Sequence, residues 1–432
     1  MMKGKRFWPA LAAALLLFPA GPAAAGASVT VPDPGALDAI LDRHVDEGFY
    51  PFLHARLENA NGDPIYEHSA VNERLLPGLQ VGGDTWIRIW SMSKIVTITV
   101  VLDLVEEGML SLDDPVTEYI PEFSDLRVAM TPDGRSLSEA RRSESAAEAC
   151  PLRLVATQSA MTLMQLIVHE AGFYYALNGI PCLDEPLSAL NLVTSANTGE
   201  FIGRLAQLPL IHQPGSSYHY GLNTTVLGFV AERATGKSLA QLVRERLTGP
   251  LGIEGLRYGL PPGAELIQRT SGRDGALREA HPGELDIFGP DVPDYDPAHE
   301  LYLGGEGMLA TADGYADYLR MLLNGGSLNG YRFLDASTVE DIHAPHTVVD
   351  EYRGHNGMNL WVSGPEMRDR DEGEAGLWIG GGYEGTHFWV DPKRRFVAVI
   401  MTQMSWVPPG GRGRDAAFRG ALYRQFRAAA ES

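Results

Sequence analysis

The sequence predicts an α+β fold in which one antiparallel sheet is built from both ends of the chain and a mainly helical lobe is inserted between them. Strand-like runs occur at residues 52–89 and again at 360–402, and helical patterns dominate the long stretch between these regions. We therefore expect residues 28–115 and 300–432 to form the sheet domain, flanked by helices. Residues 116–299 are expected to form the inserted helical lobe.

The N-terminus is typical of a secretory signal peptide over residues 1–27. A basic stretch ending at Arg6 precedes an apolar run, Phe7–Phe18, and small residues with candidate cleavage sites follow around Ala25. The apolar run is too short to span a bilayer, and no later segment is long and apolar enough to do so. We therefore expect an exported, periplasmic or extracellular protein without stable membrane insertion.

The first segment of the sheet domain alternates helix, strand and helix. Residues 34–47 carry apolar side chains at helical spacing, and short strand-like runs follow at Phe52–Leu57 and Trp86–Ile89. From Ser91 the pattern becomes helical and ends at Gly108, a residue type that commonly terminates helices.

The inserted lobe shows helix starts with side-chain caps. Thr162 is predicted to cap a helix that ends at Gly172, and a second helical stretch ends at Gly236. Ser238 with Gln241 forms the pattern of a capping box at the start of the next helix.

The C-terminal segment returns to strands. A helix is predicted over Ala312–Leu323, followed by strands at Leu360–Val362, Thr386–Val390 and Phe396–Thr402. A final helix is expected from Asp415 onward, because apolar residues recur there on one side.

The charge balance excludes polyanionic partners. The chain has 55 acidic and 35 basic residues and a formal net charge of −20, which opposes binding to nucleic acid or an anionic membrane. The only cysteines, Cys150 and Cys182, are too few for a disulfide scaffold or a cysteine-rich metal module. They could pair in an oxidising compartment, or remain as two buried thiols.

Ser91 and Lys94 form the pattern S-x-x-K at the predicted start of a helix. Residues at i and i+3 lie on one helix face, so the serine hydroxyl and the lysine amine can meet. After residue 27 the chain holds 29 arginines but only three lysines. A buried lysine can have its pKa lowered until it acts as a base, whereas arginine cannot be deprotonated in this way. This predicts a serine nucleophile activated by Lys94.

Several segments in order extend this pattern. Residues 86–94 (Trp-Ile-Arg-Ile-Trp-Ser-Met-Ser-Lys) and 112–116 (Leu-Asp-Asp-Pro-Val) resemble the nucleophile segment of the serine β-lactamase-like hydrolases. That group includes class C β-lactamases, D-alanyl-D-alanine peptidases and family VIII carboxylesterases. Residues 162–172 resemble the family's T-x-x-x-L-L-x-H-x-S-G helix, and 305–313 and 322–326 resemble the start and end of its later glycine-rich helix. The resemblance covers about residues 35–430 and implies the β-lactamase/transpeptidase-like fold.

The family's catalytic tyrosine corresponds to Tyr220. The Val-Leu-Gly that follows at residues 226–228 has the spacing of the esterase motif, which Tyr218 would break. The resemblance implies that Tyr220 shuttles a proton between the nucleophile and the leaving group. The asparagine of the family's Tyr-x-Asn is replaced by Leu222, and Asn223 is expected to compensate in part by lining the site.

A glycine-rich strand completes the resemblance at Gly380–Thr386. It resembles the Trp-Gly-Gly strand of the esterases, and it implies that the backbone N–H groups of Ser91 and Tyr383 form the oxyanion hole. Gly381, Gly382 and Glu384 are expected to line the substrate site. The strand lacks the Lys or His that holds a substrate carboxylate in the peptidases and lactamases, which favours an ester substrate.

No cofactor or metal is expected. The spacing Gly380-x-Gly382-x-x-Gly385 matches a dinucleotide fingerprint, but a strand follows it where that fingerprint requires a helix. His343 and His346 lack a third ligand for a metal.

The sequence thus predicts a serine hydrolase that forms an acyl-enzyme on Ser91 and acts on small esters. A β-lactamase or D-amino-acid peptidase is the alternative within the family. A non-catalytic module that binds cell-wall peptides is the alternative from another class, and the presence of Ser91, Lys94 and Tyr220 together favours the enzyme.

Overall fold

The architecture was obtained from a computed structural model of the whole chain. The predicted signal peptide, residues 1–27, lies outside the part of the chain that the structure describes. In that part, no helix combines the length and the apolar character needed to cross a bilayer. The described residues are 29–139, 150–176, 179–180, 182–281, 284, 300–411 and 413–431.

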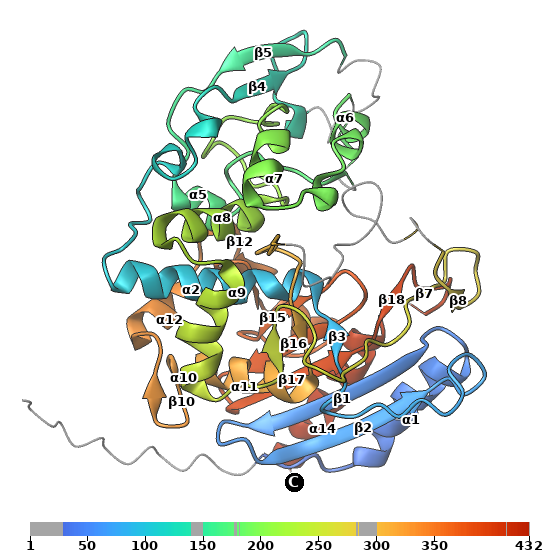
Figure 1. Cartoon of the computed structure of the whole chain (residues 1–432). Helices are drawn as coiled ribbons and strands as arrows, with labels where there is room; N and C mark the ends of the chain where they lie inside the picture. The colour runs from blue at the N-terminus through green and yellow to red at the C-terminus, as the bar shows by residue number, and fades with distance from the viewer. Residues whose placement is uncertain are drawn as a thin grey trace, which may run out of the picture.

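The main sheet is antiparallel throughout and joins the two ends of the chain (Figure 1). Its strand order is β12-β13-β14-β15-β16-β17-β1-β2, so the C-terminal strand β17 pairs with the N-terminal strand β1. The strands are β1 (Phe52–Asn59), β2 (Pro64–Val71), β12 (Thr347–Asp350), β13 (Gly354–Asn356), β14 (Trp361–Ser363), β15 (Trp378–Gly381), β16 (His387–Asp391) and β17 (Phe396–Met401). This arrangement confirms the predicted fold class, including the sheet built from both termini.

Helices cover both faces of this sheet and explain why β17 is apolar along its whole length. Helices α1 (Pro34–Asp46) and α14 (Arg414–Glu431) pack on one face, and α11 (Ala312–Leu323) packs on the other (Figure 1). Alternate residues of β17 enter the two separate cores, so all six are buried. A strand buried on both faces reads as a continuous apolar run.

Helix α2 (Ser93–Glu106) lies between the sheet domain and the inserted lobe (Figure 1). The helix is buried on every side from Ser93 to Leu102, because it also packs against α8 (Asn223–Thr235) and the segment that precedes β9. A helix that is apolar all round is an interior helix. A short 3-10 turn, η1 (Trp90–Met92), precedes it, so Ser91 lies in this turn and not in the α-helix itself.

The inserted lobe is mainly helical, as predicted, and two of its helix starts have the predicted caps. Thr162 with Gln165, and Ser238 with Gln241, form reciprocal capping boxes. The helix after Thr162 ends at Ile167, earlier than Gly172, and the hairpin β4–β5 was not predicted. The lobe contains η2 (Val116–Glu118), η3 (Pro121–Phe123), β4 (Arg127–Met130), β5 (Arg153–Ala156), α5 (Leu163–Ile167), α6 (Asp184–Ala189), η5 (Leu192–Thr194), α7 (Thr198–Leu205), α8, α9 (Leu239–Leu242), the π-helical η6 (Val243–Thr248) and α10 (Gly249–Leu251).

Short strands after α10 pair with the terminal segments. The predicted insert, 116–299, therefore includes strands that hydrogen-bond outside it. One three-stranded sheet contains β3 (Ile87–Arg88), β9 (Leu309–Ala310) and β6 (Leu256–Arg257), and another contains β18 (Met404–Ser405), β7 (Thr270–Ser271) and β8 (Arg278–Glu279). The remaining elements are β10 (Ser327–Leu328), β11 (Tyr331–Arg332), α12 (Ala336–Ile342) and α13 (Glu366–Asp369).

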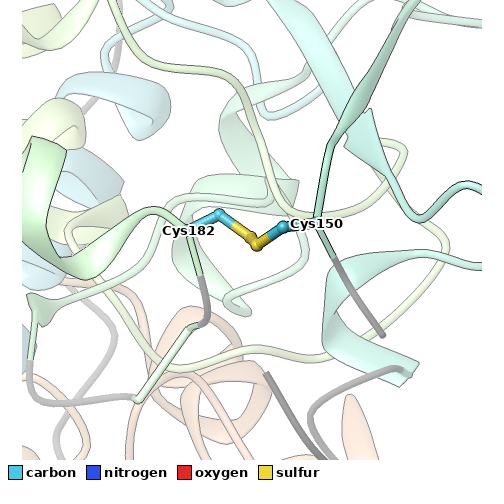
Figure 2. The surroundings of a disulfide bond; sticks show 2 residues. All are labelled: Cys150 and Cys182. Carbon is cyan, nitrogen blue, oxygen red and sulfur yellow. A yellow bond between two sulfur atoms is a disulfide. The ribbon is translucent and has the colours of Figure 1, made fainter. Parts of the chain in front are cut away.

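Cys150 and Cys182 are joined in a disulfide (Figure 2). Their Cα atoms lie 6.4 Å apart, within the range that the bond requires. The bond links the start of β5 to the chain just before α6, so it fastens two parts of the inserted lobe.

Candidate active site

Ser91 and Lys94 meet as the i, i+3 spacing predicts. Ser91 Oγ lies 3.1 Å from Lys94 Nζ, and Ser91 lines a cavity. Trp90, directly before the serine, has a left-handed backbone (φ 46°), which is rare for a bulky side chain. Such a conformation costs about 1–3 kcal/mol and persists only where the surroundings impose it.

The Lys94 side chain is completely buried and meets three acceptors. Besides Ser91 Oγ, Nζ lies 2.8 Å from the carbonyl oxygen of Gly305 and 3.3 Å from Oε1 of Glu306. Gly305 allows this approach because a Cβ there would lie 2.8 Å from Thr225 Oγ1 and 3.3 Å from Lys94 Nζ. Three acceptors match the three N–H donors of an ammonium group.

The pKa of Lys94 is raised, in contrast to the lowered pKa that the sequence suggested. Burial opposes the charged form, but interactions with Tyr220 and Glu306 outweigh it. Nζ lies 4.9 Å from the centroid of the Tyr220 ring. Lys94 is therefore an ammonium group in the free protein, and the proton acceptor for Ser91 must be sought elsewhere.

Glu306 was not assigned a role from the sequence, although its segment was part of the family resemblance. Its side chain is fully buried and accepts hydrogen bonds from Thr225 Oγ1 (2.6 Å) and from the hydroxyl of Tyr175, in addition to its contact with Lys94. An acidic residue between glycines, in a segment otherwise rich in apolar residues, was the available signal. Tyr175 has no local sequence signal, because only the tertiary fold brings it to Glu306.

Tyr220 lines the same cavity as Ser91 and packs against His169, with ring centroids 4.7 Å apart. The His169 ring lies between two amides: Nε2 is 2.9 Å from Asn359 Oδ1, and Nδ1 is 2.9 Å from Asn223 Nδ2. Burial lowers the pKa of His169 to about 3, so the ring is neutral. These contacts require Nε2 to carry the proton.

Asn223 is therefore placed differently from the prediction. Its side chain is completely buried and holds His169 and the carbonyl of His219, so it supports the cavity wall from behind and does not line the cavity.

The turn after β15 brings the predicted oxyanion segment beside the nucleophile. A Cβ on Gly382 would lie 2.4 Å from the carbonyl oxygen of Ile89, so only glycine permits this approach. The next residue, Tyr383, packs edge-to-face on Trp90 with ring centroids 5.5 Å apart. The backbone of Tyr383 is thus held next to the turn that carries Ser91.

Glu384 does not line the substrate site, contrary to the prediction. Its side chain is completely buried, and its two oxygens accept hydrogen bonds of 2.8 Å from Trp90 Nε1 and from Arg269 Nε. Gly382 lies against Ile89 and is not among the residues that line the cavity, whereas Gly381 is.

The cavity beside Ser91 has a volume of about 160 Å³ and a mixed lining. Apolar side chains come from α2, β14, β15 and β16, and the polar groups are hydroxyls, amides and one imidazole. None of the described residues that line it is Lys, Arg, Asp or Glu. The lining residues are Ser91, Ile95, Val168, His169, Tyr218, Tyr220, Asn356, Gly357, Asn359, Leu360, Trp361, Ile379, Gly380, Gly381 and Phe388.

The described residues contain no cluster of three or more His, Cys, Asp or Glu side chains that could hold a metal ion. His343 stacks on Trp378, and His346 Nε2 donates to the carbonyl oxygen of Asp341. The dinucleotide-like glycines lie in β15 and the turn that follows it, so no helix begins there.

The sheet, the interior helix and the contact between Ser91 and the buried Lys94 define an enzyme of the serine β-lactamase-like hydrolases. A sequence model of the beta-lactamase family matches residues 59–422. The chain belongs to the beta-lactamase family.

Relatives of the chain include hydrolases and acyltransferases. It is 29% identical over 300 residues to esterase EstB of Burkholderia gladioli, covering 66% of this chain and 68% of the relative. It is 26% identical over 373 residues to monacolin J acid methylbutanoyltransferase of Aspergillus terreus, covering 81% and 84%. The structure of EstCE1, a hydrolase with promiscuous acyltransferase activity, matches with a TM-score of 0.70 at 20% identity, over 90% of this chain and 97% of that chain.

Proposed function

We propose that the protein is a carboxylesterase that hydrolyses small esters through an acyl-enzyme on Ser91. The observation that carries this proposal is the 3.1 Å contact between Ser91 Oγ and Lys94 Nζ at a cavity without charged lining among the described residues. A substrate that carries a carboxylate, as β-lactams and D-peptides do, would find no cation in that lining. A neutral ester fits it better.

In the proposed reaction Ser91 Oγ bonds to the ester carbonyl carbon while its proton passes to the Tyr220 oxygen. Lys94 Nζ lies 4.9 Å from the centroid of the Tyr220 ring, so its positive charge stabilises negative charge on the Tyr220 oxygen during this transfer. The N–H groups of Ser91 and Tyr383 stabilise the tetrahedral oxyanion. The ester C–O bond then breaks, and Tyr220 returns the proton to the departing alcohol. Water repeats the sequence on the acyl-enzyme and releases the acid.

The cavity favours a short acyl group. Its volume of about 160 Å³ is close to the ~150 Å³ of an engineered cavity that holds one benzene molecule. We therefore propose an uncharged acyl chain of roughly six non-hydrogen atoms, by that comparison.

Acyl transfer to an acceptor alcohol is the second candidate. The names of two relatives describe acyl transfer, and the same acyl-enzyme would serve if an alcohol replaced water. The ratio of ester to acid formed when a short alcohol is added would separate the two activities.

We propose further that the protein is exported, since residues 1–27 have the layout of a signal peptide and Cys150 is joined to Cys182. Mass spectrometry of the mature N-terminus from cell fractions tests this: a chain that starts near residue 26 outside the cytoplasm supports export. A full-length cytoplasmic chain contradicts it.

The function is tested with p-nitrophenyl esters of increasing acyl length and a chromogenic cephalosporin. Ester turnover should be highest for short acyl groups and should fall at least 10³-fold in Ser91→Ala. Ser124→Ala, at an exposed serine of the inserted lobe, is the matched control and should leave turnover unchanged.

Dominant cephalosporin cleavage would instead favour a β-lactamase. The absence of both activities, with no mass shift from a fluorophosphonate probe, would overturn the catalytic proposal and leave the binding module.

A further inference from the structure

The buried acid beneath the lysine is not explained by the proposed reaction alone. Glu306 is 1% exposed, and both of its oxygens are occupied: Oε1 by Lys94 Nζ and the Tyr175 hydroxyl, and Oε2 by Thr225 Oγ1. Its hydrogen-bond partners Lys94, Tyr175 and Thr225 do not line the cavity, but Lys94 contacts Ser91 and Tyr175 packs on Tyr220, which do. Its position is therefore one step removed from a bound substrate.

The charge and the position of Glu306 indicate a specific role for this residue. Removing a carboxylate and an ammonium from water costs several kcal/mol for each ion, and each is tolerated only with a partner and further hydrogen bonds. Glu306 and Lys94 meet both conditions. Nζ has three acceptors at 2.8–3.3 Å, which satisfy an ammonium group but exceed the two N–H donors of a neutral amine.

We propose that Glu306 is a positioning residue that holds Lys94 in its ammonium form and directs it at Ser91, so that Tyr220 receives the serine proton. This inference rests on the proposed serine-hydrolase function, and it adds the residue that supports the lysine of the same site.

The other titratable groups around the pair do not replace Glu306. Tyr175 and Tyr220 both lie near Nζ, with ring centroids at 5.4 and 4.9 Å. Burial and the neighbouring Glu306 raise the pKa of Tyr175 well above its ordinary value, so this phenol stays neutral. His169 packs against Tyr220, and His219 is a further neighbour of His169. The lowered pKa of His169 keeps its ring uncharged. Among the described residues that contact Lys94, Glu306 is the only carboxylate.

The test compares Glu306→Gln with wild type over pH 5–10. Glutamine keeps the shape but removes a negative charge, and this lowers the pKa of every group nearby. Both limbs of the pH profile of kcat/KM should move to lower pH by about one unit, so that activity above the basic limb falls about tenfold. KM should change little, because Glu306 does not line the cavity.

Two variants separate this role from a merely structural one. Glu306→Asp keeps the charge and should restore the wild-type position of both limbs. Thr225→Val disturbs the same buried contact but leaves the carboxylate, so it should lower stability without moving the profile. If Glu306→Gln does not fold, the pH profiles of Glu306→Asp and Thr225→Val test the proposal. Profiles that coincide with wild type support it, and shifted profiles contradict it.

The rate at which a fluorophosphonate labels Ser91 is measured at each pH as a second readout. Labelling without ester turnover in wild type would contradict the ester substrate, while the labelling profiles would still test Glu306. An unshifted Glu306→Gln profile would overturn the positioning role. A wild-type protein that neither labels nor turns over ester would overturn both proposals.

Discussion

Glu384 and Trp90 show how single side chains fix the geometry of a backbone site. Trp90 is held in a left-handed conformation directly before Ser91, and its indole N–H donates to Glu384, which directly follows Tyr383. One hydrogen bond thus ties the nucleophile turn to the proposed oxyanion segment. Arg269 supplies the cation that makes a fully buried carboxylate tolerable there.

We predict that Glu384→Gln lowers both stability and kcat. The Arg269 guanidinium, only 14% exposed, would lose the ion pair with Glu384, and breaking one side of a buried pair costs about 3–5 kcal/mol. Urea denaturation measures the loss of stability, and kcat at saturating ester measures the displacement of the oxyanion segment.

The double variant Glu384→Gln/Arg269→Gln removes both charges and should recover part of the lost stability. A loss in the double variant that equals the sum of the losses in Glu384→Gln and Arg269→Gln would show that the two side chains do not interact.

For single residues, the sequence predicted contacts between positions that are close to each other along the chain. Ser91 and Lys94 could be placed together because they share one helical turn. Glu306 and Arg269 reach the site only through tertiary contacts with residues over 100 positions away, and no local pattern records such contacts. Glu384 was predicted near the site, but its burial behind Trp90 depends on a partner in another segment.

Of the structural elements, the turn after β15 most strictly requires a glycine, a residue without a side chain. Gly382 passes the carbonyl of Ile89 and Thr386 Oγ1 so closely that a Cβ would lie 2.4 and 2.3 Å from them. The contact with Ile89 involves backbone, which cannot rotate away. The whole turn must therefore move if any side chain is added.

Gly382→Ala should displace this turn and reduce kcat at least tenfold for a protein that still folds, by analogy with the loss of one oxyanion donor. The matched control is Gly203→Ala in α7, where a Cβ would meet nothing within 4 Å. That change should stabilise the protein by about 0.5–1 kcal/mol, since alanine favours helix interiors. Thermal unfolding and ester turnover distinguish the two, and full activity in Gly382→Ala would contradict the close approach.

Elements with strong apolar periodicity were predictable and others were not. Strands β16 and β17 were found because burial makes their sequences apolar, and α1, α11 and α14 because one face of each is apolar. Strand β2 carries mostly exposed or half-buried residues, and of the short strands β12 is the opposite edge of the sheet and β13 is its neighbour. Their sequences lack a clear alternation because few of their side chains enter a core.

For the whole molecule, buried neutral histidines predict acid sensitivity. Burial lowers the pKa of His54 to about 4, of His169 to about 3 and of His387 to about 4. In the unfolded chain each would titrate near pH 6.5. Between pH 6.5 and about 4 the unfolded state therefore binds protons that the native state does not, so stability falls as the pH falls.

The free energy of unfolding should decrease by roughly 1.4 kcal/mol per pH unit for each such histidine over this window. Urea denaturation at pH 7, 6, 5 and 4.5 measures the slope. His54→Gln should reduce this slope by about 1.4 kcal/mol per pH unit, the contribution of one proton. His281→Gln, at an exposed position, should leave the slope unchanged. Identical slopes in wild type and His54→Gln would contradict the neutral state of His54.

The pairing of β1 with β17 also sets when activity can arise during synthesis. Ser91 and Lys94 leave the ribosome more than 200 residues before Gly305 and Glu306, and the strand that stands beside Ser91 follows later still. Strand β1 can pair with β17 only after all the intervening chain has been made. A nascent or truncated chain thus contains the nucleophile without the site around it. The proposed reactive centre is therefore completed only by segments translated long after Ser91, and a chain that stops before them lacks the site.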